Sequence, residues 1–308
     1  MKNIYFISIL LVLITSFYVV AVVQEIYIPE SFSQAMISHP DDLKAYNKFL
    51  EKTPHKALLN QIVDQYYQFL DKARERYTDE YIIPKIIHQI WIGPRPLPEK
   101  TRAWQESWLT MHPDWEYKLW TNDDVEGFVF ENKKYFDKAV NWGEKADILR
   151  YEILYHFGGV YVDIDFESLK PLDWLNQVCD FYVGIHAVPL LFKNRLRINN
   201  GIIAARPGHP ILAHAVNSLK HFVNKRGVAN RTGPDFFTSI IEDILPLESD
   251  SLDMIFPSNF FYPSGPMAAS YGFTIQPGKA YVQPETLAVH YYTAFWIKPP
   301  KRFKRRRR

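Results

Sequence analysis

Hydrophobic residues along this chain follow two different spacings, which predict alternating strands and helices. Five short apolar runs have the length of strands: 86–91, 117–120, 158–165, 181–186 and 198–205. Elsewhere, apolar residues recur every three or four positions, which is the helical spacing. The clearest helical stretches are 98–111, 142–157 and 209–223. Because the two patterns alternate, we expect an α/β fold with helices on both faces of one sheet.

The first residues form the longest apolar run. Ile4–Val23 carries no charge and is about 20 residues long, the length that crosses a bilayer. Lys2 precedes the run and Glu25 follows it, so we expect a single-pass, N-in signal anchor over residues 1–24. In a eukaryotic-type host the rest of the chain would then lie in the lumen of the ER or Golgi. A cleaved signal peptide is the alternative.

Residues 25–81 are expected to form a helical stem. Thr53 and Pro54 are typical of a helix start, with Thr as the cap and Pro at the first helical position. The apolar residues that follow share one face: Leu58, Ile62, Tyr66, Phe69 and Ala73. The stem could be a spacer from the membrane or an extra helical layer on the next domain. We expect that domain over 82–298 and a basic tail over 299–308.

The predicted strand 158–165 ends in two carboxylates, Asp163 and Asp165. Side chains alternate across a strand, so both aspartates face the same way, opposite to Val160, Val162 and Ile164. Two like charges beside a buried strand are costly unless a positive group lies between them. A divalent cation that also binds phosphate oxygens would supply it. A strand end with two solvated aspartates is the simpler alternative.

The helix before this strand adds two more charged residues. Asp147 and Arg150 lie three positions apart and can meet on one side of the helix. Gly158–Gly159 then ends the helix, as a left-handed cap requires. The sequence therefore places Asp147 and Arg150 close to Asp163 and Asp165. A plain Asp–Arg pair on the surface is the alternative.

Taken in order, these segments resemble the DXD glycosyltransferases of family 32, which include fungal initiating mannosyltransferases and mannosylinositol phosphorylceramide synthases. The matching segments are 83–91, 117–120, 145–151, 158–165, 199–201, 232–235, 289–290 and Trp296. The resemblance implies the GT-A fold, a mixed sheet with helices on both faces. It also implies a retaining hexosyltransferase, with a mannosyltransferase as one option. The donor would be a UDP-hexose or GDP-mannose, and the acceptor a glycan or glycolipid.

Glycosyl transfer places negative charge on a departing diphosphate, and a cation held by Asp165 with help from Asp163 would neutralise it. Because the available ligands are carboxylates rather than thiolates, Mn²⁺ or Mg²⁺ is expected. Asp163 could instead contact the ribose. His290 could complete the site, although a lone His on a strand is often a core residue. Trp91, at the end of the first strand, could stack on the base or pack in the core.

By resemblance, Asp147 and Arg150 would hold the donor, and Asn199 or Asn200 would bind its sugar; a simple turn before Gly201 is the alternative for the two asparagines. Asp235 could face the acceptor or cap a helix. Trp296 matches the end of a Ser-X-Trp motif in the family. The Ser position falls on Phe295 or Ala294, so no hydroxyl is expected there.

Composition narrows the alternatives. The formal net charge of +2 gives no general attraction to nucleic acid, and a single cysteine, Cys179, excludes an intrachain disulfide or a multi-cysteine metal site. A phosphatase of the haloacid-dehalogenase type also uses Asp-X-Asp, but requires Thr or Val two residues later, where Glu167 stands. A non-catalytic protein that binds nucleotide-sugars or glycans on the same fold remains as the second alternative.

Overall fold

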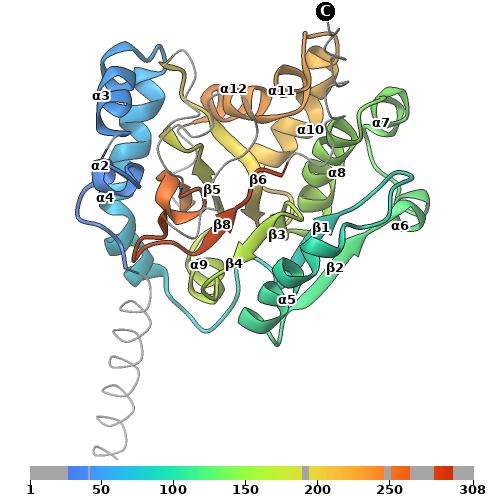
Figure 1. Ribbon diagram of the computed structural model, residues 1–308, viewed down its shortest axis with the longest axis horizontal. Coiled ribbons are helices and arrows are strands. Elements are labelled where there is room, and N and C mark those ends of the chain that lie inside the picture. The colour runs from blue at the N-terminus through green and yellow to red at the C-terminus, as the bar shows by residue number, and fades with distance from the viewer. Residues whose placement is uncertain (1–26, 41, 189–193, 246–250, 264–280, 294–308) are drawn as a thin grey trace, which may run out of the picture.

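The structure is a computed structural model that describes residues 27–40, 42–188, 194–245, 251–263 and 281–293 (Figure 1). Its centre is a six-stranded sheet in the order β2-β1-β3-β6-β5-β7. The strands are β1 Ile86–Ile90, β2 Glu116–Trp120, β3 Gly159–Val162, β5 Phe181–Ile185, β6 Ile198–Ala205 and β7 Asp253–Phe256. A separate antiparallel pair consists of β4 Phe166–Ser168 and β8 Ala288–His290.

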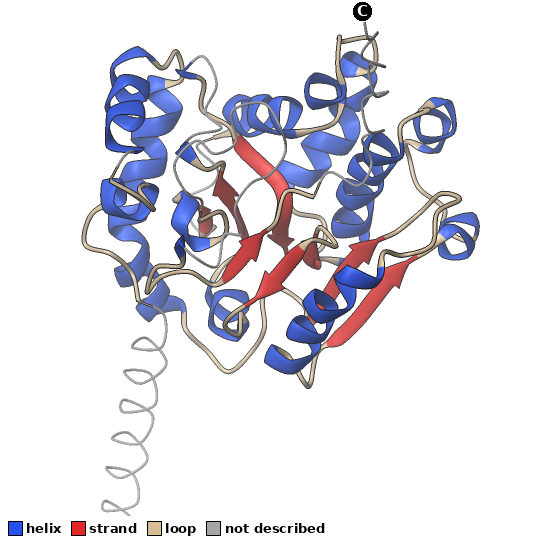
Figure 2. Ribbon diagram, viewed as in Figure 1, coloured by secondary structure: helices blue, strands red, loops and turns tan. Residues whose placement is uncertain are grey.

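The central sheet is mixed. Strand β1 pairs parallel with β2 and β3, and β5 pairs parallel with β7. Strand β6 runs antiparallel to both of its neighbours, β3 and β5. Helices surround these strands in Figure 2. The predicted α/β class with a mixed sheet is confirmed.

The helices follow the predicted spacing closely. After β1 they are α5 Arg102–Met111, α6 Asn122–Glu126, α7 Lys133–Lys138, α8 Trp142–Phe157, α9 Asp173–Val178, α10 Pro210–Phe222, α11 Val228–Arg231 and α12 Pro234–Ile244. Short 3₁₀ turns occupy Glu99–Thr101 and Ser258–Phe260. Helix α8 packs against α10, β3 and β6, and α12 packs against α10 and β6. These contacts hold the start of α8, the end of β3 and the start of β6 in one region.

Three helices precede the sheet: α2 Phe32–Met36, α3 Asp42–Lys52 and α4 Lys56–Arg76. They lie together at the left of Figure 1. The predicted apolar face of α4 is buried, and Phe69 packs edge-on against Trp174 and Phe256, with ring centroids 5.5 and 5.4 Å away. Through these contacts α4 forms a layer on β7 and α9.

The predicted start of this helix is wrong by two residues. Helix α4 begins at Lys56, with His55 as its cap, rather than at Pro54. The reason is that Thr53 closes the preceding helix α3, donating its backbone N–H to the Phe49 carbonyl. The Thr53 hydroxyl instead accepts a hydrogen bond from the His55 N–H at 3.3 Å.

Among the described residues, no helix has both the length and the apolar character needed to cross a bilayer. The predicted anchor over residues 1–24, the basic tail over 299–308 and Trp296 lie outside the described residues.

The glycine pair after α8 connects this helix directly to β3. Gly158 and Gly159 have φ angles of 65° and 90°, which other residues rarely adopt. A Cβ atom on Gly159 would lie 2.7 Å from the Ile86 carbonyl oxygen, and one on Gly158 would lie 2.6 Å from Pro207. Only glycine therefore fits where the chain turns from α8 into the middle of the sheet.

Candidate active site

One cavity of about 420 Å³ lies past the ends of β1 and β3 and beside the start of α8. All eight residues predicted to bind donor or metal line it: Trp91, Asp147, Arg150, Asp163, Asp165, Asn199, Asn200 and His290. The carboxyl ends of parallel strands are where ligands bind in open α/β sheets. The cavity occupies that position beside β1 and β3.

The two aspartates lie in a turn, not along the strand as the sequence predicted. Strand β3 ends at Val162, and the Phe166 N–H donates to the Asp163 carbonyl across the turn at 3.1 Å. The Asp163 N–H remains attached to β6 through the Gly201 carbonyl at 2.8 Å. Because the chain reverses here, strand alternation does not place the two carboxylates. Contacts with the C-terminal segment place Asp165 instead, and Asp163 is held by Arg150 and by the Tyr161 hydroxyl, which donates to it at 2.7 Å.

His290 joins the two aspartates. Its partner in the β4–β8 pair is Phe166, and the two rings stack with centroids 4.5 Å apart. The His290 Nε2 atom lies 3.2 Å from Asp165 Oδ1 and 3.9 Å from Asp163 Oδ2. One ligand atom from each of the three residues falls within 4.8 Å of the others. We call Asp163, Asp165 and His290 the cavity triad.

A divalent cation fits the cavity triad. Two carboxylates and one imidazole are a common donor set for such ions. The Nδ1 atom of His290 is buried and has no hydrogen-bond partner among the described residues. The ring is therefore oriented by packing against Phe166 rather than by a hydrogen bond at its far nitrogen.

Asp165 is held firmly in its charged form. Its Oδ2 atom accepts hydrogen bonds from the Thr293 N–H at 2.6 Å and the Thr293 hydroxyl at 2.8 Å. Burial alone would raise the pKa of Asp165, but His290 and Thr293 outweigh it and lower this pKa to about 2. The sequence did not point to Thr293, because the Ser position of the family motif was aligned with Ala294 or Phe295, where no hydroxyl is present. Searching one further residue upstream would have found it.

Arg150 connects α8 to the aspartate turn. It is 5% exposed, and its guanidinium lies 3.0 Å from Asp147 Oδ1 and 3.2 Å from Asp163 Oδ1. It also donates to the Asn200 carbonyl, and its Cζ atom lies 4.4 Å from the Tyr161 ring centroid. The predicted Asp147–Arg150 pair exists, but it is buried in the cavity wall rather than on the surface.

Asp147 is almost fully enclosed. Its Oδ1 accepts from the Asn200 side chain and its Oδ2 from the Thr232 hydroxyl, both at 2.9 Å. Burial raises the pKa of Asp147 to about 6, although Arg150 and these hydrogen bonds act in the opposite direction. This carboxyl therefore changes charge within the range where most enzymes work.

The two asparagines play different local parts. Asn200 binds Asp147, as described, and also donates to the Tyr151 hydroxyl at 2.9 Å. The Asn199 Oδ1 accepts from the Gly201 N–H at 2.8 Å, so its amide nitrogen points toward His186 Nε2 at 3.2 Å. His186 lines the cavity and was not predicted. Its position at the end of the predicted strand 181–186 was the available signal.

Trp91 follows β1 at the mouth of the cavity and is half-buried, so it is not a core residue. Asp235 does not line the cavity. It forms a two-pronged ion pair with Arg197, with N–O distances of 2.6 and 2.8 Å, and Arg197 lines the cavity in its place. Trp296 lies outside the described residues.

Comparisons with known proteins agree with these motifs. A protein family described as "Glycosyltransferase sugar-binding region containing DXD motif" matches residues 98–182. An "Uncharacterized glycosyltransferase L373" of Acanthamoeba polyphaga mimivirus is 30% identical over 190 residues, covering 59% of this chain and 74% of the viral protein. The "Mannosyl phosphorylinositol ceramide synthase SUR1" of Saccharomyces cerevisiae is 34% identical over 168 residues, or 52% of this chain.

The match to the yeast protein spans 42% of its length, so this chain aligns with less than half of that relative. Among solved structures, the "PaToxG Glycosyltransferase" is similar with a TM-score of 0.46 and 20% identity, covering 68% of this chain and 80% of that one. The alignment with most of the viral protein, together with the family match across the aspartate motif, establishes the relationship. The chain belongs to the family of glycosyltransferases whose sugar-binding region contains a DXD motif.

Proposed function

We propose that this protein is a hexosyltransferase of the GT-A type, which moves a sugar from a nucleotide-sugar donor to a glycan or glycolipid acceptor. One observation carries the proposal: the cavity triad and the buried Arg150 converge on a single cavity in an α/β fold. A donor of this class offers a sugar, a diphosphate and a base. The cavity wall offers a polar group or an aromatic ring for each.

Asp163, Asp165 and His290 would hold a divalent cation, Mn²⁺ or Mg²⁺. When bound, such an ion neutralises the charge that grows on the departing diphosphate. The imidazole of His290 favours Mn²⁺, because Mg²⁺ prefers a shell made entirely of oxygen. Since the pKa of Asp165 is about 2, this ligand needs no deprotonation at neutral pH.

The chain's own residues would orient the donor. Trp91 would stack on the base at the cavity mouth, a contact that accepts uracil and guanine alike. Arg150 is a fixed cation behind the aspartate turn, and Asp147 would bind a sugar hydroxyl together with Asn199 or Asn200. Retention of configuration follows from the family resemblance, and no residue is assigned as the nucleophile.

Mannose is the proposed sugar, because the curated relatives that the chain matches include a protein named "Initiation-specific alpha-1,6-mannosyltransferase". GDP-mannose is then the donor to test first, with UDP-hexoses as alternatives. We also propose that residues 1–24 anchor the protein in a membrane, that 25–81 form the helical layer before the catalytic domain 82–298, and that 299–308 form a basic tail.

A screen of the full-length protein against sugar nucleotides, with Mn²⁺ present and without it, tests the proposal. Released nucleoside diphosphate is the readout, because slow hydrolysis of the donor does not require the acceptor. We expect release from one donor class that depends on the cation. Binding of a sugar nucleotide without release would instead indicate a binding protein, and phosphate release from simple esters would indicate a phosphatase.

A further inference from the structure

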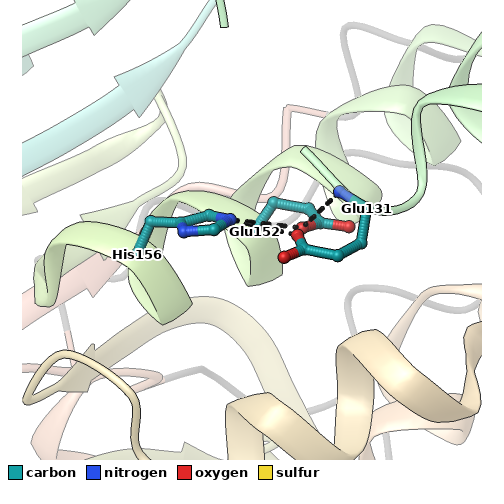
Figure 3. Close-up of side chains that lie close together, drawn as sticks. All are labelled: Glu131, Glu152 and His156. Carbon is teal, nitrogen blue, oxygen red and sulfur yellow. Dashed lines mark hydrogen bonds and ion pairs between the residues drawn. The ribbon is translucent and has the colours of Figure 1, made fainter. Parts of the chain in front are cut away.

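A second group of metal-ligating side chains lies outside the cavity (Figure 3). Glu152 and His156 stand one turn apart on α8, and Glu131 reaches them from the segment between α6 and α7. One ligand atom from each residue falls within 4.8 Å of the other two. None of the three lines the cavity. We call Glu131, Glu152 and His156 the outer triad.

The distances within the outer triad suit a single small cation. His156 Nε2 lies 3.0 Å from Glu131 Oε2 and 3.9 Å from Glu152 Oε2. Ligands bound at about 2.0–2.2 Å to one tetrahedral zinc ion are about 3.4 Å apart, between these two values. The spacing of Glu and His by four positions on a helix directs both side chains to the same side. Figure 3 shows the imidazole aimed at the two carboxylates.

Hydrogen bonds hold the Glu152 side chain in one position. It is fully buried, and its Oε1 accepts hydrogen bonds from the Asn132 N–H at 2.9 Å and the Asn132 side chain at 2.7 Å. The Asn132 amide is fixed in turn by the Val216 carbonyl at 2.9 Å. Oxygen Oε2, on the side of His156, accepts a long hydrogen bond of 3.4 Å from the Glu131 N–H, and the Glu152 carboxyl also makes a side-chain hydrogen bond with that of Glu131. Outer hydrogen bonds of this kind orient metal ligands in known sites.

Among the described residues, His156 is the only cationic partner of the two carboxylates in the outer triad. Within the part of the chain that the structure describes, neither Glu131 nor Glu152 forms an ion pair with lysine or arginine. A buried carboxylate beside a second carboxylate is costly without a positive partner. The side chains of Glu131 and His156 are 50% and 33% exposed, so an ion can enter from solvent and keep a water ligand.

We propose that Glu131, Glu152 and His156 form a second divalent-metal site, which binds Zn²⁺ and fastens the segment between α6 and α7 to α8. A site of two carboxylates and one imidazole with an open position suits zinc better than magnesium, which requires an octahedral oxygen shell. Because α8 also carries Asp147 and Arg150, zinc would stabilise the helix that forms one wall of the cavity. This site does not depend on the proposed glycosyl transfer.

Zinc binding to the metal-stripped, full-length protein tests the proposal without any substrate. The variant Asp163→Asn/Asp165→Asn removes the cavity triad, so that bound zinc reports on the outer triad alone. We expect about one Zn²⁺ per chain in this background by elemental analysis, together with a zinc-dependent rise in the unfolding temperature. No zinc bound at micromolar concentrations would overturn the proposal.

Adding Glu131→Gln or His156→Asn to that background identifies the ligands. Both side chains are partly exposed, so the variants should fold, and each should weaken zinc binding at least tenfold and abolish the rise in unfolding temperature. Glu51→Gln, an exposed position on α3, is the matched control and should bind zinc normally. Zinc binding that survives both substitutions in the triad would show that the ion lies elsewhere, and the proposal would be wrong.

Discussion

The cavity triad and the outer triad each combine two carboxylates with one imidazole, but the charges of their carboxylates are balanced differently. In the cavity triad, the carboxylates meet Arg150, the Thr293 hydroxyl and backbone N–H groups. In the outer triad, Glu152 accepts hydrogen bonds from Asn132 but lies beside Glu131, and His156 is the only cationic side chain that either carboxylate meets among the described residues. Arg150 therefore balances the carboxylates of the first triad, whereas no lysine or arginine does so in the described part of the second.

The pKa values record this difference. His290 and Thr293 overcome burial and lower the pKa of Asp165 to about 2, whereas burial and the neighbouring Glu131 raise the pKa of Glu152 to about 8. A cation can bind Asp165 without displacing a proton, but it must displace one from Glu152. Burial alone therefore does not decide whether a carboxylate is ready to bind a metal. The neighbouring charges and hydrogen-bond donors also determine whether it is ionised.

The largest expected effect comes from the cavity triad. Asp165→Asn keeps the size of the side chain but removes a charged ligand, so turnover should fall by about three orders of magnitude, a loss of several kcal/mol. Circular dichroism and the unfolding temperature should show an intact fold. Glu131→Gln, the same change in the outer triad, should retain most of the activity. Equal losses in both variants would mean that the two triads are not functionally distinct.

Arg150→Met should give the next largest effect and should differ from any change in the outer triad. Removing the guanidinium leaves Asp147 and Asp163 without their cation, and breaking a buried ion pair costs about 3–5 kcal/mol of stability. We expect weaker donor binding and a lower urea midpoint, both measurable on the purified protein. An unchanged midpoint would indicate that the Asn200 and Thr232 hydrogen bonds suffice to hold Asp147.

How far the sequence predicted these features depends on how local their signals are. Helix α8 and strand β6 were predicted to the residue, because the spacing of apolar residues within each segment is a local signal. For α8, the Gly158–Gly159 pair directly after it also marks the end of the helix. The turn at Asp163 was missed, since it is defined by hydrogen bonds to Gly201 and Phe166 rather than by the pattern of apolar residues.

Contacts between residues that are far apart in the sequence were even harder to predict. His290 reaches Asp165 only because β8 pairs with β4, and no local pattern encodes that pairing. The sequence suggested His290 only through its family resemblance. Glu131 gave no signal at all, because its two partners lie on another element and the connecting segment is irregular. The cavity was therefore largely predictable from motifs, whereas the outer triad required the structure.

The titration of Asp147 should give a smaller effect, visible only as a pH profile. Its pKa is raised from 3.8 to about 6 by burial, among Arg150, Asp163 and Tyr151. In the proposed site the ionised form would bind a sugar hydroxyl, so turnover should rise through pH 6, about tenfold between pH 5 and pH 7. Because the pKa of Asp147 is higher in the folded protein than in the unfolded chain, protonation of this carboxyl favours folding. The free energy of unfolding without ligand should therefore fall as pH rises from about 4 to 6.

Asp147→Asn should remove that pH dependence of stability, while Asp235→Asn, whose partner is Arg197, should leave it unchanged. A wild-type stability profile that stays flat between pH 4 and 6 would contradict the burial argument.

The smallest expected effect is the change in unfolding temperature caused by Glu131→Gln. It is the most specific test of the outer triad, because its sign should differ with and without zinc. Without metal, Glu131→Gln removes the carboxylate that, together with burial, raises the pKa of Glu152, and it loses an exposed pair with His156, which is worth little at this exposure. We therefore expect an unfolding temperature within about 2 °C of the wild type, on the higher side, from calorimetry in chelator. With zinc present the order should reverse, because only the wild type gains from the ion. A clear loss of stability in chelator would mean that the Glu131–His156 pair holds the segment between α6 and α7 by itself, without a cation.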